Sequence, residues 1–224
     1  DLRARGFAAT LLAVGAQAGM PMKIQGEDLP GVLIGVDFLR QVGLGQAPAI
    51  RGRVAVIGGG NTAMDAARTS LRLGADRVMV LYRRSREEMP ASEVEIEEAI
   101  EEGVEFHYLT APIEVRGQGK AERLLCLKMA LGEPDASGRR RPVPMAGSEF
   151  EIEVDHVIAA IGQAVEPSFG KLEATPPEMN RRGAITVREG TYETSLPGVF
   201  AIGDAVTGPQ AAIDAIAGAG AASK

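Results

Sequence analysis

A glycine-rich hexapeptide carries the clearest chemical signature in the sequence. Residues 58–63 read GGGNTA and fit the pattern G-x-G-x-x-A. In this pattern the first glycine permits a tight turn, the second lets the backbone approach a pyrophosphate, and the alanine allows close helix–strand packing. The phosphates then meet the free N–H groups and the positive dipole end of the following helix. The motif predicts a dinucleotide-binding turn, and a glycine turn that binds nothing is the alternative; the predicted contact residues are Gly58, Gly60, Asn61, Thr62 and Ala63.

The residues about 20 positions further on indicate which dinucleotide is bound. An NAD site usually has Asp or Glu there, at the end of the next strand, to hold the ribose hydroxyls. In this sequence Arg83 and Arg84 follow the apolar run 80–82, and no carboxylate occurs before Glu87. Because two guanidinium groups attract a 2′-phosphate, the sequence predicts NADPH as the coenzyme. The alternative is a solvated run of surface charges, since further charged residues follow directly.

The segments around this turn alternate between strand-like and helix-like patterns. Residues 53–57 form a short apolar run, 61–73 have helical periodicity, and 77–82 form the next apolar run. This order is typical of a Rossmann-like α/β domain. Downstream, strand-like segments joined by turns predict a β-meander inserted in that domain, and a last buried strand closes it; these segments are 113–116, 122–131, 150–154 and, for the closing strand, 156–161. Near the chain ends we expect a buried strand over 7–14, a strand over 199–202 and a helix over 210–217.

Composition excludes several classes of function. The net charge is −6 without a concentrated basic face, so we expect no nucleic-acid partner. No apolar run reaches the length of about 20 residues that a membrane span needs, so we expect no membrane partner and a cytoplasmic location. The single Cys126 cannot form a disulphide, a redox pair or an iron–sulphur ligand set within this chain. His107 and His156 are far apart in sequence, and we predict no metal site and no catalytic side chain.

Three segments together resemble a known family. They are 54–67 (VAVIGGGNTAMDAA), 82–84 with 88–91 (YRR with EMPA) and 132–141 (GEPDASGRRR). Over nearly the whole chain the sequence resembles the small, or beta, subunit of NADPH-dependent glutamate synthase and its relatives, which include the reducing portion of dihydropyrimidine dehydrogenase. The resemblance implies an FAD-binding domain interrupted by an inserted NADPH-binding domain. By this comparison residues 1–30 and 159–224 are partial segments of the FAD-binding domain, and 31–158 are the NADPH-binding domain.

The resemblance also implies a set of flavin contacts. Gly162 and Gln163 look like the return into the FAD-binding domain. The segment 194–204 is similar to the family's C-terminal flavin motif, which ends here in Gly203 and Asp204. In that motif the aspartate bonds the ribityl and pyrophosphate region, and the start of the next helix directs N–H groups at the flavin ring. Those helix-start residues are Ala211, Ala212 and Ile213.

The function that follows from the resemblance is hydride transfer from NADPH to FAD, with electrons passed to a large catalytic subunit or another electron acceptor. The family's first FAD fingerprint and its cysteine-rich iron–sulphur segment are absent from this sequence. We therefore expect a fragment that lacks the N-terminal FAD and iron–sulphur region and is inactive in isolation. Two alternatives stay open: a non-catalytic NADPH-binding module, and the reducing part of another FAD enzyme such as a disulphide or pyrimidine reductase.

Overall fold

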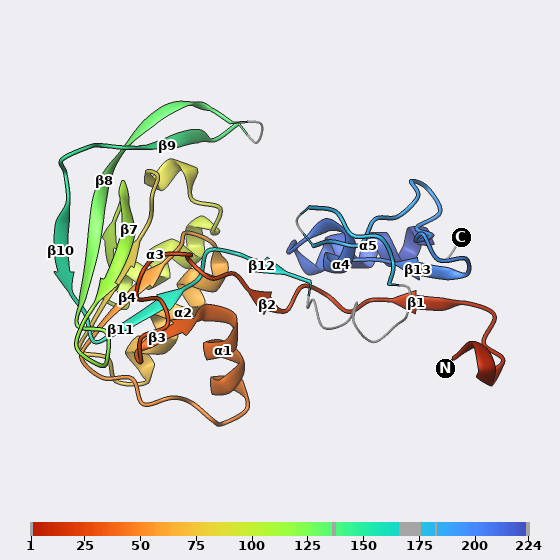
Figure 1. Ribbon diagram of the computed structural model, residues 1–224, viewed down its shortest axis with the longest axis horizontal. Coiled ribbons are helices and arrows are strands. Elements are labelled where there is room, and N and C mark those ends of the chain that lie inside the picture. Colours follow the sequence, from red (N-terminus) through yellow and green to blue (C-terminus); the bar gives the residue numbers. More distant parts are fainter. Residues whose placement is uncertain (1, 136–137, 166–175, 182, 223–224) are drawn as a thin grey trace. The chain divides into compact units, whose positions relative to one another are not determined.

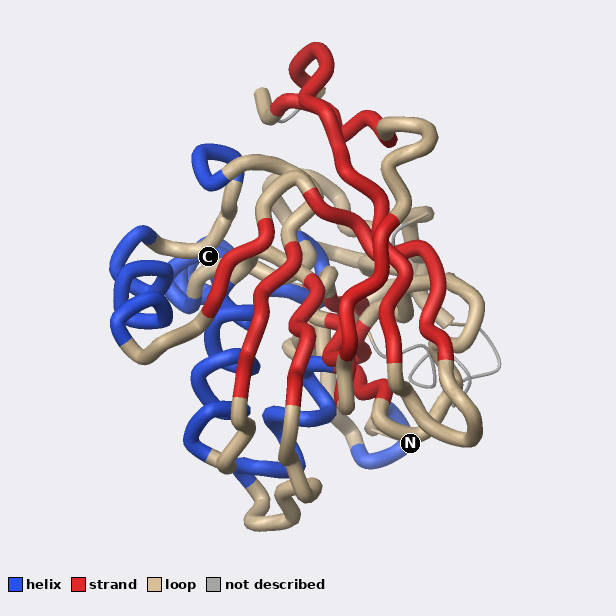
Figure 2. Tube along the Cα trace, turned by 90° about the vertical axis from the view of Figure 1, so that its left-hand side faces the viewer, coloured by secondary structure: helices blue, strands red, loops and turns tan. Residues whose placement is uncertain are grey.

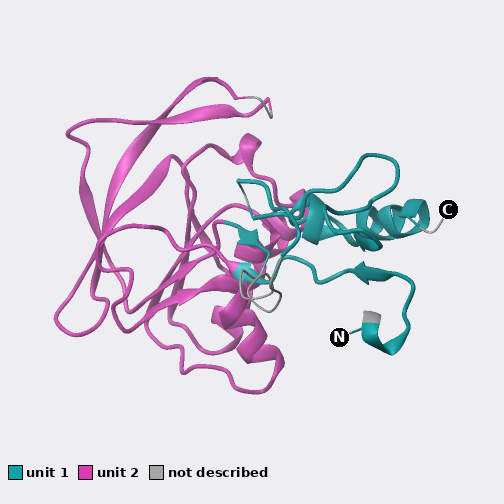
Figure 3. Ribbon diagram, turned by 45° about the vertical axis from the view of Figure 1, so that its right-hand side comes forward, with its two compact units in different colours: residues 1–18, 162–224 teal, residues 19–161 magenta. Residues whose placement is uncertain are grey.

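The computed structural model describes residues 2–135, 138–165, 176–181 and 183–222. The chain divides into two compact units (Figure 3). Unit 1 consists of Asp1–Ala18 and Gly162–Lys224, and unit 2 of Gly19–Ile161. The two units are described separately below. Residues 136 and 137 of the GEPDASGRRR segment lie outside the described residues.

Unit 2 is built on a five-stranded sheet with the order β3-β11-β4-β5-β6. All neighbouring strands in it are parallel, so the predicted Rossmann-like α/β class is confirmed. The central strands are apolar throughout because both faces of the sheet are covered. The sequence missed β3, whose three residues are too few to show a pattern. The strands are β3 (Val32–Ile34), β4 (Arg53–Ile57), β5 (Arg77–Leu81), β6 (Glu105–His107) and β11 (His156–Ala159).

Three helices cover one face of this sheet (Figure 2). They are α1 (Gly35–Gly43), α2 (Asn61–Arg72) and α3 (Glu93–Glu101). The core between them and the sheet contains Phe38, Met64 and Ile96, each no more than 1% exposed. Helix α2 presents small alanines and Met64 to the strands at i, i+3 and i+4 spacing, which lets it pack closely on β4 and β5.

An antiparallel sheet covers the other face of the parallel sheet (Figure 1), and it contains the strands that the sequence predicted as a β-meander. Its order is β10-β8-β7, with β9 paired to β8, and its strands are β7 (Thr110–Arg116), β8 (Arg123–Pro134), β9 (Arg140–Pro144) and β10 (Phe150–Glu153). Leu124 and Cys126 of β8 pack here against the central sheet. Strand β9 was missed because prolines and arginines obscure its pattern. Proline has no N–H group, and it fits in β9 because an edge strand needs no N–H donors on its outer side.

Unit 1 has a smaller core, formed by Ile185, Ala201 and Ala205. Its β1 (Thr10–Leu12) pairs in parallel with β13 (Val199–Ala201) in a two-stranded sheet. The expectation of a buried strand over 7–14 was wrong. Only three of those residues are in β1, and the Leu11 side chain is 54% exposed because, within the described residues, β13 is the strand that pairs with it. The helices are η1 (Arg3–Arg5), α4 (Asp204–Thr207) and α5 (Ala212–Ala222), and no described residue of α5 is buried.

The two short strands β2 (Ala18–Gly19) and β12 (Gln163–Ala164) pair with each other. They lie where the chain passes between the units, after residue 18 and after residue 161. The sequence placed the boundaries after residues 30 and 158. Which cofactor each unit binds stays a prediction. Among the described residues, every helix is shorter or more polar than a bilayer span requires.

Candidate functional site

The glycine turn joins the end of β4 to the start of α2, at the carboxyl edge of the parallel sheet. Gly58 has φ +147°, a conformation that side chains disfavour, and its N–H donates to the Leu81 carbonyl at 3.1 Å. A Cβ at this position would overlap the carbonyl oxygen of Ala160, the residue directly after β11. Only glycine therefore permits β4, β5 and β11 to meet at this point.

Gly60 has a different environment. It is the N-cap of α2 with φ −95° and ψ 175°, and no side chain caps the helix there. The atom nearest to a Cβ at Gly60 would be Pro90 Cγ, at 3.9 Å. Within the described part of the chain, the N–H groups of Gly59, Gly60 and Asn61 have no recorded hydrogen-bond partner. The turn thus presents polar hydrogens and open space at the positive end of a helix, the arrangement that binds anions.

The other residues of the motif begin the helix. Ala63 is fully buried, and its Cβ would be 3.4 Å from a Cβ at Gly58, so a larger side chain would separate the helix from the turn. Thr62 is half-buried in the first helical turn. The Asn61 side chain has a partner that the motif did not reveal, because its Oδ1 accepts the Ser92 N–H at 3.0 Å.

The arginines after β5 are in three different environments. Arg83 is exposed, and among the described residues no hydrogen bond or ion pair is recorded for its guanidinium. Arg84 is buried, with a side chain 7% exposed, and its Nη2 lies 2.8 Å from Asp135 Oδ2. Its Nε also donates to the Arg140 carbonyl at 2.7 Å. Arg86 pairs with Glu93, whose hydrogen bond raises the pKa of the arginine.

The sequence predicted that Arg83 and Arg84 share the binding of a phosphate. The structure gives the Arg84 guanidinium other partners: Asp135 neutralises its charge at Nη2, and the Arg140 carbonyl accepts its Nε–H. Arg83 is therefore the arginine with donors available at the end of β5. Nothing in the order of the residues distinguishes the two arginines, since the partner Asp135 is 51 residues away.

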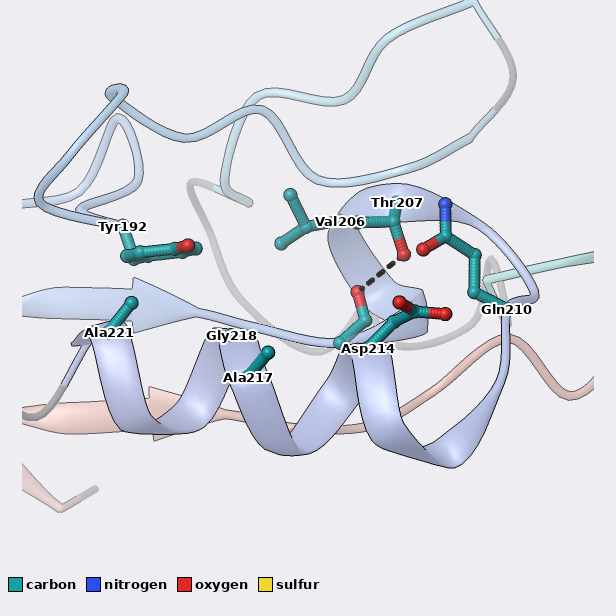
Figure 4. Close-up of a pocket in the computed structure, with 9 residues that line it drawn as sticks. Tyr192, Val206, Thr207, Gln210, Asp214, Ala217, Gly218 and Ala221 are labelled. Atoms are coloured by element: carbon teal, nitrogen blue, oxygen red, sulfur yellow. Dashed lines mark hydrogen bonds between the residues drawn. The ribbon is translucent and has the colours of Figure 1, made fainter.

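Unit 1 contains the predicted flavin residues. Gly203 has φ +62° and precedes α4, and Asp204 Oδ1 accepts the Gln210 N–H at 3.2 Å. A cavity of about 450 Å³ lies beside them (Figure 4), lined by Tyr192, Gly203, Val206, Thr207, Gln210, Asp214, Ala217, Gly218 and Ala221. Thr207 Oγ1 donates to the Gly203 carbonyl at the edge of this cavity, the bond that is dashed in the figure.

The remaining predicted flavin residues are less enclosed. Helix α5 begins at Ala212, and Ile213 is 68% exposed. The Ala211 N–H donates to Asp214 Oδ2 at 3.2 Å, so in this structure it does not present a free donor. Gly162 has φ +149°, and Gln163 belongs to β12.

The glycine turn after β4 and Gly203 after β13 lie in a chain whose sequence matches a known family over almost its full length. Residues 3–219 match the family described as pyridine nucleotide-disulphide oxidoreductase. The chain belongs to this family.

Several relatives of this chain are named as NADP- or NADPH-dependent subunits. It is 46% identical to NADP(+)-dependent formate dehydrogenase subunit beta of Moorella thermoacetica, over 97% of this chain and 31% of that protein. It is 39% identical to the NADPH glutamate synthase small chain of Escherichia coli strain K12, over 94% of this chain and 48% of that protein. The resemblance to glutamate synthase small subunits is confirmed. The chain spans between about a third and a half of the length of these two relatives.

Solved structures show the same fold at low sequence identity. Mycobacterium tuberculosis FprA in complex with NADPH superposes with a TM-score of 0.83, covering 99% of this chain and 63% of that one at 22% identity. Lactococcus lactis thioredoxin reductase has a TM-score of 0.67, covering 96% of this chain and 63% of that one at 22% identity. Both likenesses concern the fold alone.

The family's name includes disulphides, and the one cysteine of this chain bears on that chemistry. Cys126 is fully buried in β8, and burial raises the pKa of its thiol to about 12. A reactive cysteine needs a lowered pKa and access to solvent. Cys126 therefore acts as a small apolar core residue. Among the described residues no group of His, Cys, Asp or Glu is arranged to hold a metal ion.

Sequence reasoning missed three residues that shape the glycine turn and its surroundings. Tyr82 was expected only as the last residue of an apolar run, and neither Ser92 nor Asp135 was assigned a role at the turn. Tyr82 packs on Gly59, Ser92 bonds Asn61, and Asp135 neutralises Arg84. Position could have indicated two of them, since Tyr82 and Ser92 flank the charged segment between β5 and α3, whereas Asp135 is 51 residues away from Arg84.

Proposed function

We propose that unit 2 binds NADPH, with the pyrophosphate at the glycine turn and the 2′-phosphate at Arg83. The observation that supports this most directly joins two features. Among the residues that the structure describes, the N–H groups of Gly59, Gly60 and Asn61 have no hydrogen-bond partner, and neither has the exposed guanidinium of Arg83 at the end of the next strand. Both features attract phosphate, and they lie at the carboxyl edge of one parallel sheet, where such folds bind nucleotides.

The space at the turn fits this ligand. Because a Cβ at Gly60 would meet nothing closer than 3.9 Å, the backbone there is open to a phosphate group. The carboxylates nearest in sequence to Arg83 are also already engaged: Glu87 by Ser85, and Glu88 in the capping box that begins at Ser85. A 2′-phosphate would therefore meet a cation that no neighbouring carboxylate is recorded to neutralise among the described residues.

We further propose that unit 1 is part of an FAD-binding domain. Gly203, Asp204 and the segment 211–213 are the proposed contacts, beside the cavity that α4 and α5 line. When bound, FAD supplies the acceptor for the two electrons of a hydride, and the protein's part is to position the nicotinamide. No side chain of this chain is assigned as an acid, a base or a nucleophile.

In the intact protein, we infer, electrons pass from NADPH through FAD to a partner subunit or domain. The relatives are named as a beta subunit of a formate dehydrogenase and a small chain of a glutamate synthase, so their names place them in larger assemblies with different final chemistry. For this chain the final acceptor is another polypeptide or domain of the same general kind. The cytoplasmic location stays a prediction.

Substitution of Arg83 tests the NADPH assignment. In Arg83→Ala, loss of a charge-assisted hydrogen bond should weaken NADPH binding by about 10- to 150-fold and leave NADH binding nearly unchanged. Dissociation constants for both nucleotides would be measured by nucleotide fluorescence. Arg40→Ala is the matched control, because Arg40 is also exposed but lies on α1. Equal affinity of Arg83→Ala and the native chain for NADPH would refute the assignment.

A non-catalytic NADPH-binding module is the second candidate. The exposed apolar side chains of β1 and α5 favour it, since they leave the flavin contacts in unit 1 incompletely enclosed among the described residues. Absorbance of the purified chain separates the two functions. Flavin bands that bleach when NADPH is added support the oxidoreductase, and a colourless chain that binds NADPH supports the module.

A further inference from the structure

The segment between β5 and α3, residues 82–92, lies against the glycine turn, and we call it the brace. Its first contact is the Tyr82 ring. A Cβ at Gly59 would lie 2.5 Å from Tyr82 Cε2 and 2.6 Å from Cδ2, so the ring packs directly on the glycine backbone. Tyr82 is 6% exposed. The residue next to Arg83 is therefore also the one that supports the middle of the phosphate-binding turn.

A second set of bonds fixes the middle of the brace. The Tyr82 hydroxyl donates to the Glu88 carbonyl at 2.7 Å, and both residues are buried. The Glu88 carboxylate in turn accepts the Ser85 N–H at 3.2 Å, completing the capping box of the short helix η2 (Arg86–Glu88). Residues 82–88 are thus closed into a loop by their own side chains.

The far end of the brace returns to the turn. The Ala91 N–H donates to the Gly59 carbonyl at 3.1 Å. The Ser92 N–H donates to Asn61 Oδ1 at 3.0 Å, and Ser92 Oγ also caps α3 by accepting the Glu95 N–H. Arg83 is consequently part of a loop that is attached to the glycine turn on both sides.

We propose that the brace sets the coenzyme preference by holding Arg83 at a fixed separation from the N–H groups of the turn. Tyr82 and the Asn61 side chain are the positioning residues of this arrangement. The proposal rests on the proposed function, because it requires NADPH to bridge the turn and Arg83. A ligand gains fully from two anion sites at once only if their separation suits its two phosphate groups, and a site held loosely loses part of that gain.

The roles of the two phosphates make the effect specific. The pyrophosphate is common to NADH and NADPH, and its donors belong to the turn itself. The 2′-phosphate is found only in NADPH, and its contact depends on where the brace places Arg83. Loosening the brace should therefore weaken NADPH binding more than NADH binding, whereas a purely structural defect would lower the unfolding midpoint and leave the ratio of affinities unchanged.

Two variants of the whole chain test the proposal. Tyr82→Phe keeps the ring on Gly59 and removes the bond to the Glu88 carbonyl. Asn61→Ala removes the acceptor of the Ser92 N–H and keeps the backbone N–H of residue 61. In each we expect the ratio of the NADH and NADPH dissociation constants to fall by about 3- to 10-fold, the effect of one hydrogen bond. Tyr108→Phe is the control, since no hydrogen bond of the Tyr108 hydroxyl is recorded among the described residues.

The outcomes separate this proposal from the one it rests on. If Arg83→Ala abolishes the preference for NADPH and neither brace variant changes it, the brace has no positioning role. If Arg83→Ala leaves the preference intact, the NADPH assignment itself fails. A fall of the same size in Tyr108→Phe would also overturn the proposal, because the effect would then not be specific to the brace. Urea unfolding of each variant establishes that the protein titrated is folded.

Discussion

Gly58 and Gly60 occupy the same turn, and the structure predicts opposite consequences for the same substitution at each. In Gly58→Ala the new methyl group would overlap the Ala160 carbonyl oxygen and lie 2.9 Å from its carbonyl carbon, at a φ of +147°. In Gly60→Ala the nearest atom to the methyl group, apart from its own residue and the two neighbours in the chain, would be Pro90 Cγ at 3.9 Å, at an ordinary φ of −95°. We expect the first substitution to damage folding and the second to damage binding.

The magnitudes follow from these two environments. A non-glycine residue held in a disfavoured backbone conformation costs about 1–3 kcal/mol. Overpacking against fixed backbone costs about another 1–3 kcal/mol, so Gly58→Ala should lower the free energy of unfolding by about 2–6 kcal/mol. Gly60→Ala changes only the residue type at a helix N-cap, which affects the free energy of unfolding by less than about 1 kcal/mol. Its methyl group occupies the space of the phosphate and should weaken NADPH binding by about 10- to 150-fold.

Urea unfolding followed by circular dichroism measures the first quantity, and titration with NADPH measures the second. The native chain is the reference in both assays. The reasoning fails if Gly60→Ala binds NADPH with native affinity, because the open space at the turn would then not be the phosphate site. It also fails if Gly58→Ala unfolds at the native urea concentration, because the contact with β11 would then not constrain the turn.

Three further predictions concern groups outside the turn. Asp135→Asn should lower the free energy of unfolding by about 1–3 kcal/mol, because it leaves the buried Arg84 without its ionised partner; an unchanged urea midpoint would contradict this role. Cys126, whose pKa burial raises to about 12, should react with a chromogenic thiol reagent at pH 8 only when denaturant is added, and rapid reaction of the folded chain would disprove its burial. The side-chain hydrogen bond from Arg53 Nε lowers the pKa of Asp155, so the stabilisation by this carboxylate is present above the unfolded pKa of about 3.9 and is lost as pH falls through the folded value. The difference in unfolding free energy between the native chain and Asp155→Asn should therefore be largest near neutral pH and shrink in acid.

Much of unit 2 could be predicted because its signals are local. The apolar run 53–57, the glycine turn and the periodic helix that follows specify β4 and α2 within a residue or two of their observed ends. The closing strand was found for the same reason, since a buried parallel strand is a continuous apolar run. Strand β9 depends on its antiparallel pairing with β8, and no periodicity in its own five residues indicates that pairing.

The sequence predicted where the site lies in the chain, but it did not predict that the two arginines would differ in burial and partners. Motif spacing identified the arginine pair after β5. Burial and a carboxylate 51 positions away decide that Arg84 packs against the hairpin while Arg83 stays exposed. The buried strand expected over residues 7–14 failed in a related way, because an apolar run is buried only where another element covers it.

The pairing of β2 with β12 has an evolutionary consequence. A folded body whose entry and exit points are neighbours can be placed in a surface turn of another protein without stretching the host, and domain insertions are tolerated at such points. The polypeptide between these two short strands is thus suited to being exchanged as a cassette, so that its nucleotide specificity can change while the host polypeptide on either side keeps its own contacts.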